Sequence, residues 1–169
     1  MRPRTILASA ALLLAAATFP ITAAAAPRAA VRHLADAKLF VLETERTSYV
    51  LGVNEQNEVQ LVYWRARLLR DADYEPAHTR EAYAFESGEG LSEIEYPGWG
   101  GLRFSEPCLK VSFPDGVRDL VLKYVSHEIQ GDTLVLHLRD IGYGLAVDLT
   151  YRVFPRHDIL AKQATIRNG

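Results

Sequence analysis

The chain has 169 residues, 49% of them hydrophobic and 24% charged, which predicts one globular domain. This composition excludes an intrinsically disordered chain, a collagen and a disulfide scaffold. The formal net charge of -2 provides no electrostatic footprint for nucleic acid, so we expect no nucleic-acid partner.

Residues 1–25 are predicted to be a cleaved export signal. Arg2 and Arg4 precede an uncharged apolar run over residues 6–17, and small residues at 23–26 supply an A-x-A cleavage pattern. The run is broken by Pro20 and falls short of the about 20 apolar residues that span a bilayer; an uncleaved N-terminal anchor is the alternative. We therefore expect a secreted or periplasmic protein, with no membrane association after cleavage and a linker over residues 26–37.

The chain from residue 38 onward is predicted to be all-β. Hydrophobic residues recur with period two, and no stretch shows a sustained helical period. The expected strands cover residues 38–43, 47–53, 58–64, 106–113, 119–129, 133–140, 144–154 and 158–167, with a long polar region over 65–101. Short turns between these strands favour an antiparallel β-sandwich, and a closed barrel is the alternative.

Metal and cofactor chemistry find no support in the sequence. The single cysteine, Cys108, lies in the alternating run 107–113 and is predicted to be a small buried side chain rather than a nucleophile. If the hairpin turn centres on Gly131, then His127 and His137 fall on one face, but a zinc site would lack a third ligand. Phosphate-binding, dinucleotide-binding and nucleophile-elbow motifs are absent, so we expect no metal and no cofactor.

The glycine-rich segment 95–104 is the most specific candidate for ligand contact. It sets Tyr96, Trp99 and Arg103 among glycines; aromatic faces stack on sugar rings, and Arg donates planar hydrogen bonds. The alternative is that Trp99 fills the core beneath the loop. Acidic residues gather around this segment, and we interpret them as a solvated surface rather than as paired catalytic carboxylates: Glu81, Glu86, Glu89, Glu93, Glu95 and Glu106.

Residues 38–169 resemble the N-terminal domain of the glycoside hydrolase family 36 α-galactosidases. The most specific runs are Tyr96-Pro97-Gly98-Trp99-Gly100-Gly101 and Glu106-Pro107-Cys108-Leu109-Lys110-Val111. The resemblance implies a β-supersandwich that precedes a catalytic (β/α)8 barrel. It also implies retaining hydrolysis of terminal α-galactosides, without a metal, by two aspartates of that barrel. This chain holds neither aspartate, so we assign it no catalytic residue.

The resemblance therefore predicts the non-catalytic N-terminal domain of an exported α-galactosidase. Its expected partners are the barrel of the same parent chain, a galactoside substrate and further copies of the parent in a homo-oligomer. The substrate-binding candidates are Trp99, Arg103 and Tyr96 of the segment 95–104, together with Glu86. In some bacterial members a loop of this domain reaches a neighbouring active site, but neither Glu81 nor Glu86 can be matched to the acidic residue of that loop by pattern. The chain departs from that branch at residues 101–104 and lacks its Pro-x-Leu-Asp motif, which argues against a direct substrate role.

Two other functions remain open at this point. One is an autonomous carbohydrate-binding module that uses the segment 95–104, and the other is a periplasmic structural or assembly domain. The chain ends at Gly169, directly after an expected strand, so we expect the N-terminal piece of a longer protein. We then expect an exposed apolar patch at the contact with the rest of the protein, and an unpaired edge over residues 159–166.

Overall fold

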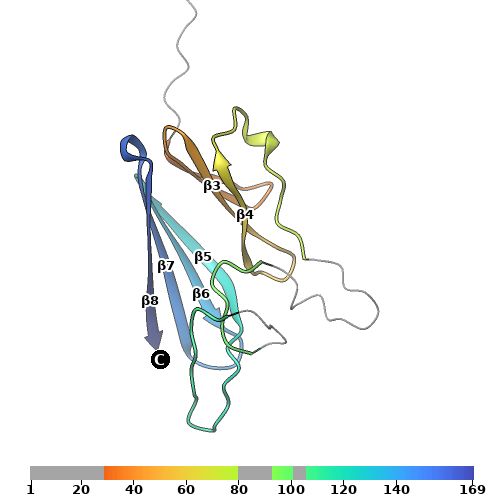
Figure 1. Ribbon diagram of the computed structural model, residues 1–169. Helices are drawn as coiled ribbons and strands as arrows, with labels where there is room; N and C mark the ends of the chain where they lie inside the picture. The colour runs from red at the N-terminus through yellow and green to blue at the C-terminus, as the bar shows by residue number, and fades with distance from the viewer. Residues whose placement is uncertain (1–28, 80–92, 101–105) are drawn as a thin grey trace, which may run out of the picture.

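The computed structural model describes residues 29–79, 93–100 and 106–169, and these form two four-stranded antiparallel sheets (Figure 1). The first sheet has the order β1-β2-β3-β4 and the second β5-β6-β7-β8. The strands are β1 (Val31–Leu34), β2 (Leu39–Glu43), β3 (Thr47–Val53), β4 (Val59–Ala66), β5 (Leu122–Gln130), β6 (Thr133–Asp140), β7 (Leu145–Phe154) and β8 (Ile159–Asn168). The two sheets are separate, so the sandwich prediction is confirmed and the closed barrel is wrong.

The helical content of the described residues is two 3-10 turns, η1 (Asp71–Asp73) and η3 (Pro155–His157). In this part of the chain no helix has the length and apolar character needed to cross a bilayer. The expected export signal lies outside the described residues.

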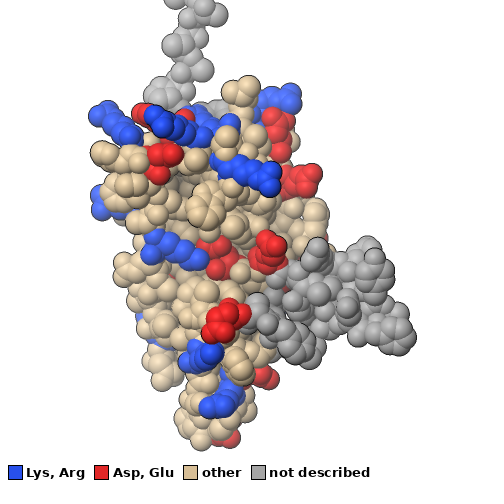
Figure 2. Space-filling model, viewed as in Figure 1, with Lys and Arg blue, Asp and Glu red and all other residues tan. Residues whose placement is uncertain are grey.

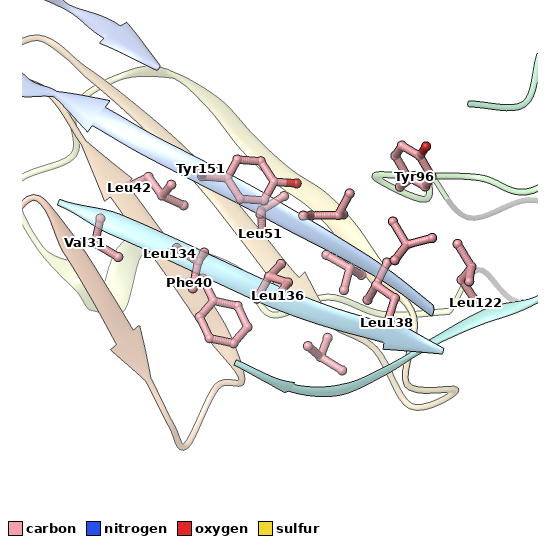
Figure 3. Close-up of a cluster of buried hydrophobic side chains, with 14 of the residues drawn as sticks. Val31, Phe40, Leu42, Leu51, Tyr96, Leu122, Leu134, Leu136, Leu138 and Tyr151 are labelled. Atoms are coloured by element: carbon pink, nitrogen blue, oxygen red, sulfur yellow. The ribbon is translucent and has the colours of Figure 1, made fainter. Parts of the chain in front are cut away.

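Side chains that alternate along the strands form one core between the sheets. On β6, Leu134, Leu136 and Leu138 point inward, as their spacing predicts. They pack against residues of the first sheet that include Phe40 and Leu42, and Figure 3 shows these side chains between the ribbons. This burial supplies the main stabilisation of the sandwich, at about 25 cal/mol for each Å² of apolar surface removed from water.

The first sheet is covered on its outer face as well. Residues 67–79, which we name the strap, place Tyr74 and Leu68 against Leu39, Val41 and Val50. Strand β2 is therefore buried on both faces, which explains why its sequence is a continuous apolar run instead of an alternating one.

A buried carboxylate attaches the strap to the sheet. Glu43, at the end of β2, accepts hydrogen bonds from Arg32 at 2.9 Å and from the Tyr74 hydroxyl at 3.1 Å. Arg67 lies 3.2 Å from the same carboxylate, and Arg32 also binds Asp71 in η1 at 2.8 Å. Burial raises the pKa of Glu43, but the hydrogen bond and the charge of Arg32 outweigh it, so the net pKa is lowered.

Two expectations about the strands and one about Cys108 are wrong. Strand β1 lies inside the expected linker 26–37. Residues 106–113 form no strand; Leu109 makes only an isolated bridge to Gly98. Pro107 and Pro114 bound this segment and lack the N–H groups that a ladder requires. Cys108 is consequently exposed, not buried, because alternation defines a buried face only within a sheet.

The β5–β6 hairpin also differs from the expected register. Gln130 pairs with Thr133, so the turn is centred between Gly131 and Asp132 rather than on Gly131. His127 then lies opposite Leu136 on the inner face, whereas His137 lies opposite Ser126 on the outer face. A half-residue change in the turn centre therefore separates two side chains that were expected on one face.

Candidate functional site

The coil of residues 93–100 and 106–121 closes one end of the sandwich (Figure 1). Its backbone is held by ordered pairs: the Trp99 N–H donates to the Leu109 carbonyl at 3.0 Å, and the Leu120 N–H donates to the Trp99 carbonyl at 2.9 Å. Gly98 is required here for space, since a Cβ atom would lie 2.3 Å from the Leu120 carbonyl oxygen. The Glu95 N–H also donates to the Val59 carbonyl of β4 at 2.8 Å, so the coil that carries Tyr96 and Trp99 is fixed to the first sheet.

The structure places two of the four predicted substrate-binding residues. Tyr96 is buried in the core cluster (Figure 3), so its ring is not on the surface of this chain. Trp99 is 45% exposed and does not fill the core beneath the loop. Glu86 and Arg103 lie outside the described residues.

Trp99 borders a shallow basic cavity of about 260 Å³ that is also lined by Lys110, Ser112 and Arg118. The Lys110 ammonium lies 5.3 Å from the centre of the Trp99 ring, a cation–π distance. The Lys110 ammonium therefore contacts the Trp99 ring, and part of the ring surface stays open to solvent.

Glu95 is buried, contrary to the interpretation that groups it with solvated carboxylates. It accepts hydrogen bonds from the hydroxyls of Tyr49 at 2.7 Å and Tyr151 at 2.8 Å. Lys162 of β8 lies 2.7 Å from the same carboxylate oxygen and also donates to the Glu95 carbonyl at 3.2 Å. Burial and then the neighbouring carboxylate raise the pKa of Tyr151, so its hydroxyl stays a donor. This cluster joins the coil to both sheets.

A concave surface lies next to this cluster, between the end of β4 and strand β8. We name it the edge cleft; its volume is about 320 Å³. Its lining combines aromatic, aliphatic and charged side chains with two hydroxyls: Leu42, Thr44, Thr47, Tyr49, Trp64, Val153, Asp158, Leu160 and Lys162. These residues come from both sheets, and the sequence analysis did not single out Trp64 as a ligand-binding candidate.

The described residues contain no group of three or more His, Cys, Asp or Glu side chains that could hold a metal ion. His137 bonds Asp148 at 2.7 Å, and His127 bonds the Tyr124 hydroxyl at 2.7 Å, so each imidazole has a local partner. On the face shown in Figure 2, acidic and basic side chains are interspersed.

Residues 57–169 match the glycosyl hydrolase family 36 N-terminal domain. The chain belongs to this family. The match confirms the resemblance seen in the runs 96–101 and 106–111, and it places the coil, the edge cleft's Trp64 and the whole second sheet within the family 36 domain.

Curated relatives of this family 36 chain carry α-galactosidase names. It is similar to alpha-galactosidase AgaA of Geobacillus stearothermophilus, with 27% identity over 159 residues that cover 78% of this chain and 22% of AgaA. It is also similar to a probable alpha-galactosidase C of Aspergillus flavus, with 29% identity over 154 residues that cover 80% of this chain and 20% of the relative. The chain thus spans about a fifth of the length of the curated relatives it matches.

Solved structures show the same fold. The α-galactosidase of Lactobacillus brevis superposes with a TM-score of 0.66 at 24% identity, covering 80% of this chain and 22% of that one. The family 36 α-galactosidase AgaB of Geobacillus stearothermophilus gives 0.69 at 22% identity, covering 82% of this chain and 22% of AgaB. The eight-stranded sandwich is therefore the family 36 N-terminal arrangement.

Proposed function

We propose that this chain is the non-catalytic N-terminal module of an exported α-galactosidase that hydrolyses terminal α-galactosides. The observation that carries the proposal is the family 36 N-terminal match, together with α-galactosidase relatives of which the chain covers about a fifth. The catalytic groups are assigned to the remainder of such an enzyme. The module supports that catalytic part, a barrel in the family, by packing against it.

Strand β8 is the surface that we assign to this packing. It is the last strand in the order of the second sheet and pairs with β7, so its other backbone edge has no ladder partner among the described residues. Ile159 and Ile166 are 52% and 48% exposed. An unpaired edge with exposed apolar side chains associates readily with another polypeptide surface. We propose that the parent's catalytic part, and a second copy in an oligomer, use this edge.

The non-catalytic role is tested by assaying the purified chain on an aryl α-galactoside. We expect no turnover above a heat-killed sample. Turnover that survives repurification and is absent from the heat-killed sample would contradict the proposal.

The role of β8 is tested by light scattering of the chain over a range of concentrations. We expect self-association that Ile166→Lys reduces, because a charge replaces an apolar contact at the free edge. Val125→Lys is the matched control, since Val125 is an exposed apolar residue on β5, the opposite edge of the same sheet. A monodisperse wild-type chain at high concentration would contradict the assignment.

Export is tested by fusing residues 1–40 to alkaline phosphatase, which is active only after export. We expect activity from the wild-type fusion and its loss in Leu13→Arg, which places a charge in the apolar run. Equal activity of the two fusions would contradict a signal function.

A carbohydrate-binding module is the second candidate function, and the partial exposure of Trp99 favours it. Exposed tryptophan rings bind sugars by stacking. Titrating the intrinsic fluorescence with galactose and raffinose separates the two functions, because a purely structural module gives no saturable change.

A further inference from the structure

Trp64 is the most exposed aromatic residue of the described sheets, although its position on β4 faces inward. It pairs in register with Tyr49, whose hydroxyl points into the buried Glu95 cluster. The two rings contact edge to face at 5.6 Å between centres. Trp64 nevertheless stays 66% exposed, because the second sheet ends at β8 and leaves the edge cleft above the indole. A large planar surface is thus presented to solvent within a concavity.

Polar groups face the indole across the edge cleft. The Asp158 carboxylate accepts hydrogen bonds from the Thr44 and Thr47 hydroxyls through one oxygen, Oδ1. Its other oxygen has no hydrogen-bond donor among the described residues. These hydrogen bonds lower the pKa of Asp158, so the group is a carboxylate at neutral pH and can accept from a ligand hydroxyl.

A donor lies in the same cleft. Lys162 donates a hydrogen bond to the Glu95 main-chain carbonyl at 3.2 Å and forms an ion pair with the Glu95 carboxylate at 2.7 Å. These two contacts hold the ammonium beside Leu160 and Tyr49 in the cleft lining. An ammonium group has three N–H donors, so Lys162 retains donor capacity for a ligand acceptor.

These groups hold their positions without a ligand. Asp158 directly follows the η3 turn and has a left-handed backbone conformation, with φ of 54°. Its side chain points toward the β2–β3 turn, where it bonds Thr47. Thr44 is buried, and Tyr49 is held by Glu95. Binding would therefore require little ordering of these side chains, which lowers one of the entropic costs of association.

We propose that the edge cleft binds a neutral saccharide, with one pyranose ring stacked on Trp64 and its hydroxyls bonded to Asp158 and Lys162. One acidic and one basic group give the cleft no preference for a charged ligand. The cavity of about 320 Å³ lies at the lower end of the usual range for ligand sites, which suits one or two sugar rings. The choice of α-galactosides as ligands rests on the function proposed above.

The chain contains two tryptophans, so the edge cleft and the Trp99 loop can be tested separately. Raffinose binding is measured by titration calorimetry on the wild-type chain, Trp64→Ala and the matched control Trp99→Ala. We expect saturable binding by the wild type and by Trp99→Ala. We expect at least a tenfold loss of affinity in Trp64→Ala, because the stacking surface is removed. Thermal unfolding of each variant checks that the fold is retained.

A second pair of measurements addresses the polar groups and self-association. Asp158→Asn keeps the side-chain size and is expected to weaken binding, since it replaces one acceptor oxygen by a donor. The Ile166→Lys chain is expected to bind raffinose like the wild type, which excludes masking of the cleft by self-association at β8. Binding that depends on Trp99 instead of Trp64, or no saturable heat with raffinose and galactose in Ile166→Lys, would overturn the proposal. Neither result bears on the non-catalytic role, which the turnover assay tests separately.

Discussion

Replacing Glu43 by glutamine removes one charge from the buried cluster that attaches the strap to the first sheet. The Glu43 side chain is 3% exposed and contacts two guanidinium groups, those of Arg32 and Arg67. Removing one partner of a buried ion pair costs about 3–5 kcal/mol, because the other charge stays buried. Arg32 keeps its bond to Asp71 and Arg67 is partly exposed, so we expect the lower end, about 3 kcal/mol.

This loss is large compared with the total stability of a domain, about 5–15 kcal/mol. For a domain of this size, about 3 kcal/mol corresponds to a fall of about 6–12 °C in the melting temperature. The assay is thermal unfolding followed by far-ultraviolet circular dichroism, repeated in urea. The matched control is Glu55→Gln, whose side chain is 56% exposed and pairs with His78, and we expect a much smaller shift there.

The pH dependence gives a second test of the Glu43 cluster. Because the pKa of Glu43 is lowered on folding, its stabilisation is present above the ordinary value of 4.5 and is lost as the pH falls below it. Glu43→Gln should therefore lose less stability than the wild type between neutral and acidic pH. Equal melting temperatures for Glu43→Gln and the wild type at neutral pH would refute the argument.

Two further predictions concern the histidine contact and the coil. Burial, and then the charge of His127, lower the pKa of His33 in the folded protein. Because the unfolded chain binds protons more readily, the melting temperature should fall as the pH drops through about 6.5. His33→Phe should reduce that fall. Gly98→Ala should destabilise the fold by about 1–3 kcal/mol, because the added Cβ atom clashes with the Leu120 carbonyl. The control Gly142→Ala should not destabilise it, since a Cβ atom there lies 3.7 Å from its nearest neighbour, the Asp140 carboxylate. Urea unfolding measures both changes.

Strands with strict alternation could be predicted from the sequence, and strands set by distant contacts could not. In strands β6 and β7 every second residue is an apolar side chain that lies in the core, as the alternation indicates. Strand β1 is four residues long and contains Arg32 and His33, whose partners lie on other strands and on the strap. Its assignment depends on pairing with β2, which no local pattern specifies.

The segment 106–113 shows the opposite error. It alternates in sequence but forms no ladder, because its backbone groups bond residues 97 and 99 of the coil. Alternation therefore predicts a strand only where a partner strand exists, and the same fact accounts for the exposure of Cys108.

The edge cleft could not be predicted because its residues come from five strands and two turns that lie far apart in the sequence. A local signal did exist: Trp64 occupies an inward position near the end of a strand that continues into Arg65. Glu95 was grouped by sequence with exposed carboxylates, and its burial depends on two tyrosines from different sheets. Sequence proximity identified the Trp99 loop, whereas spatial proximity identifies the cleft.

The two sides of the sandwich differ in the contacts between their edge strands. On the side of β1 and β5, rings from both sheets close the structure: His33 lies 4.3 Å from His127 and 4.7 Å from Phe40, between ring centres. On the side of β4 and β8, Trp64 and Ile166 stay exposed although each pairs with an inward-facing neighbour. An exposed apolar side chain does not contribute the stabilisation that burial would give, about 25 cal/mol for each Å² of apolar surface removed from water. Because ring contacts join the sheets on the β1–β5 side and Trp64 and Ile166 stay exposed on the other, we propose that the contacts with ligand and partner lie on the β4–β8 side.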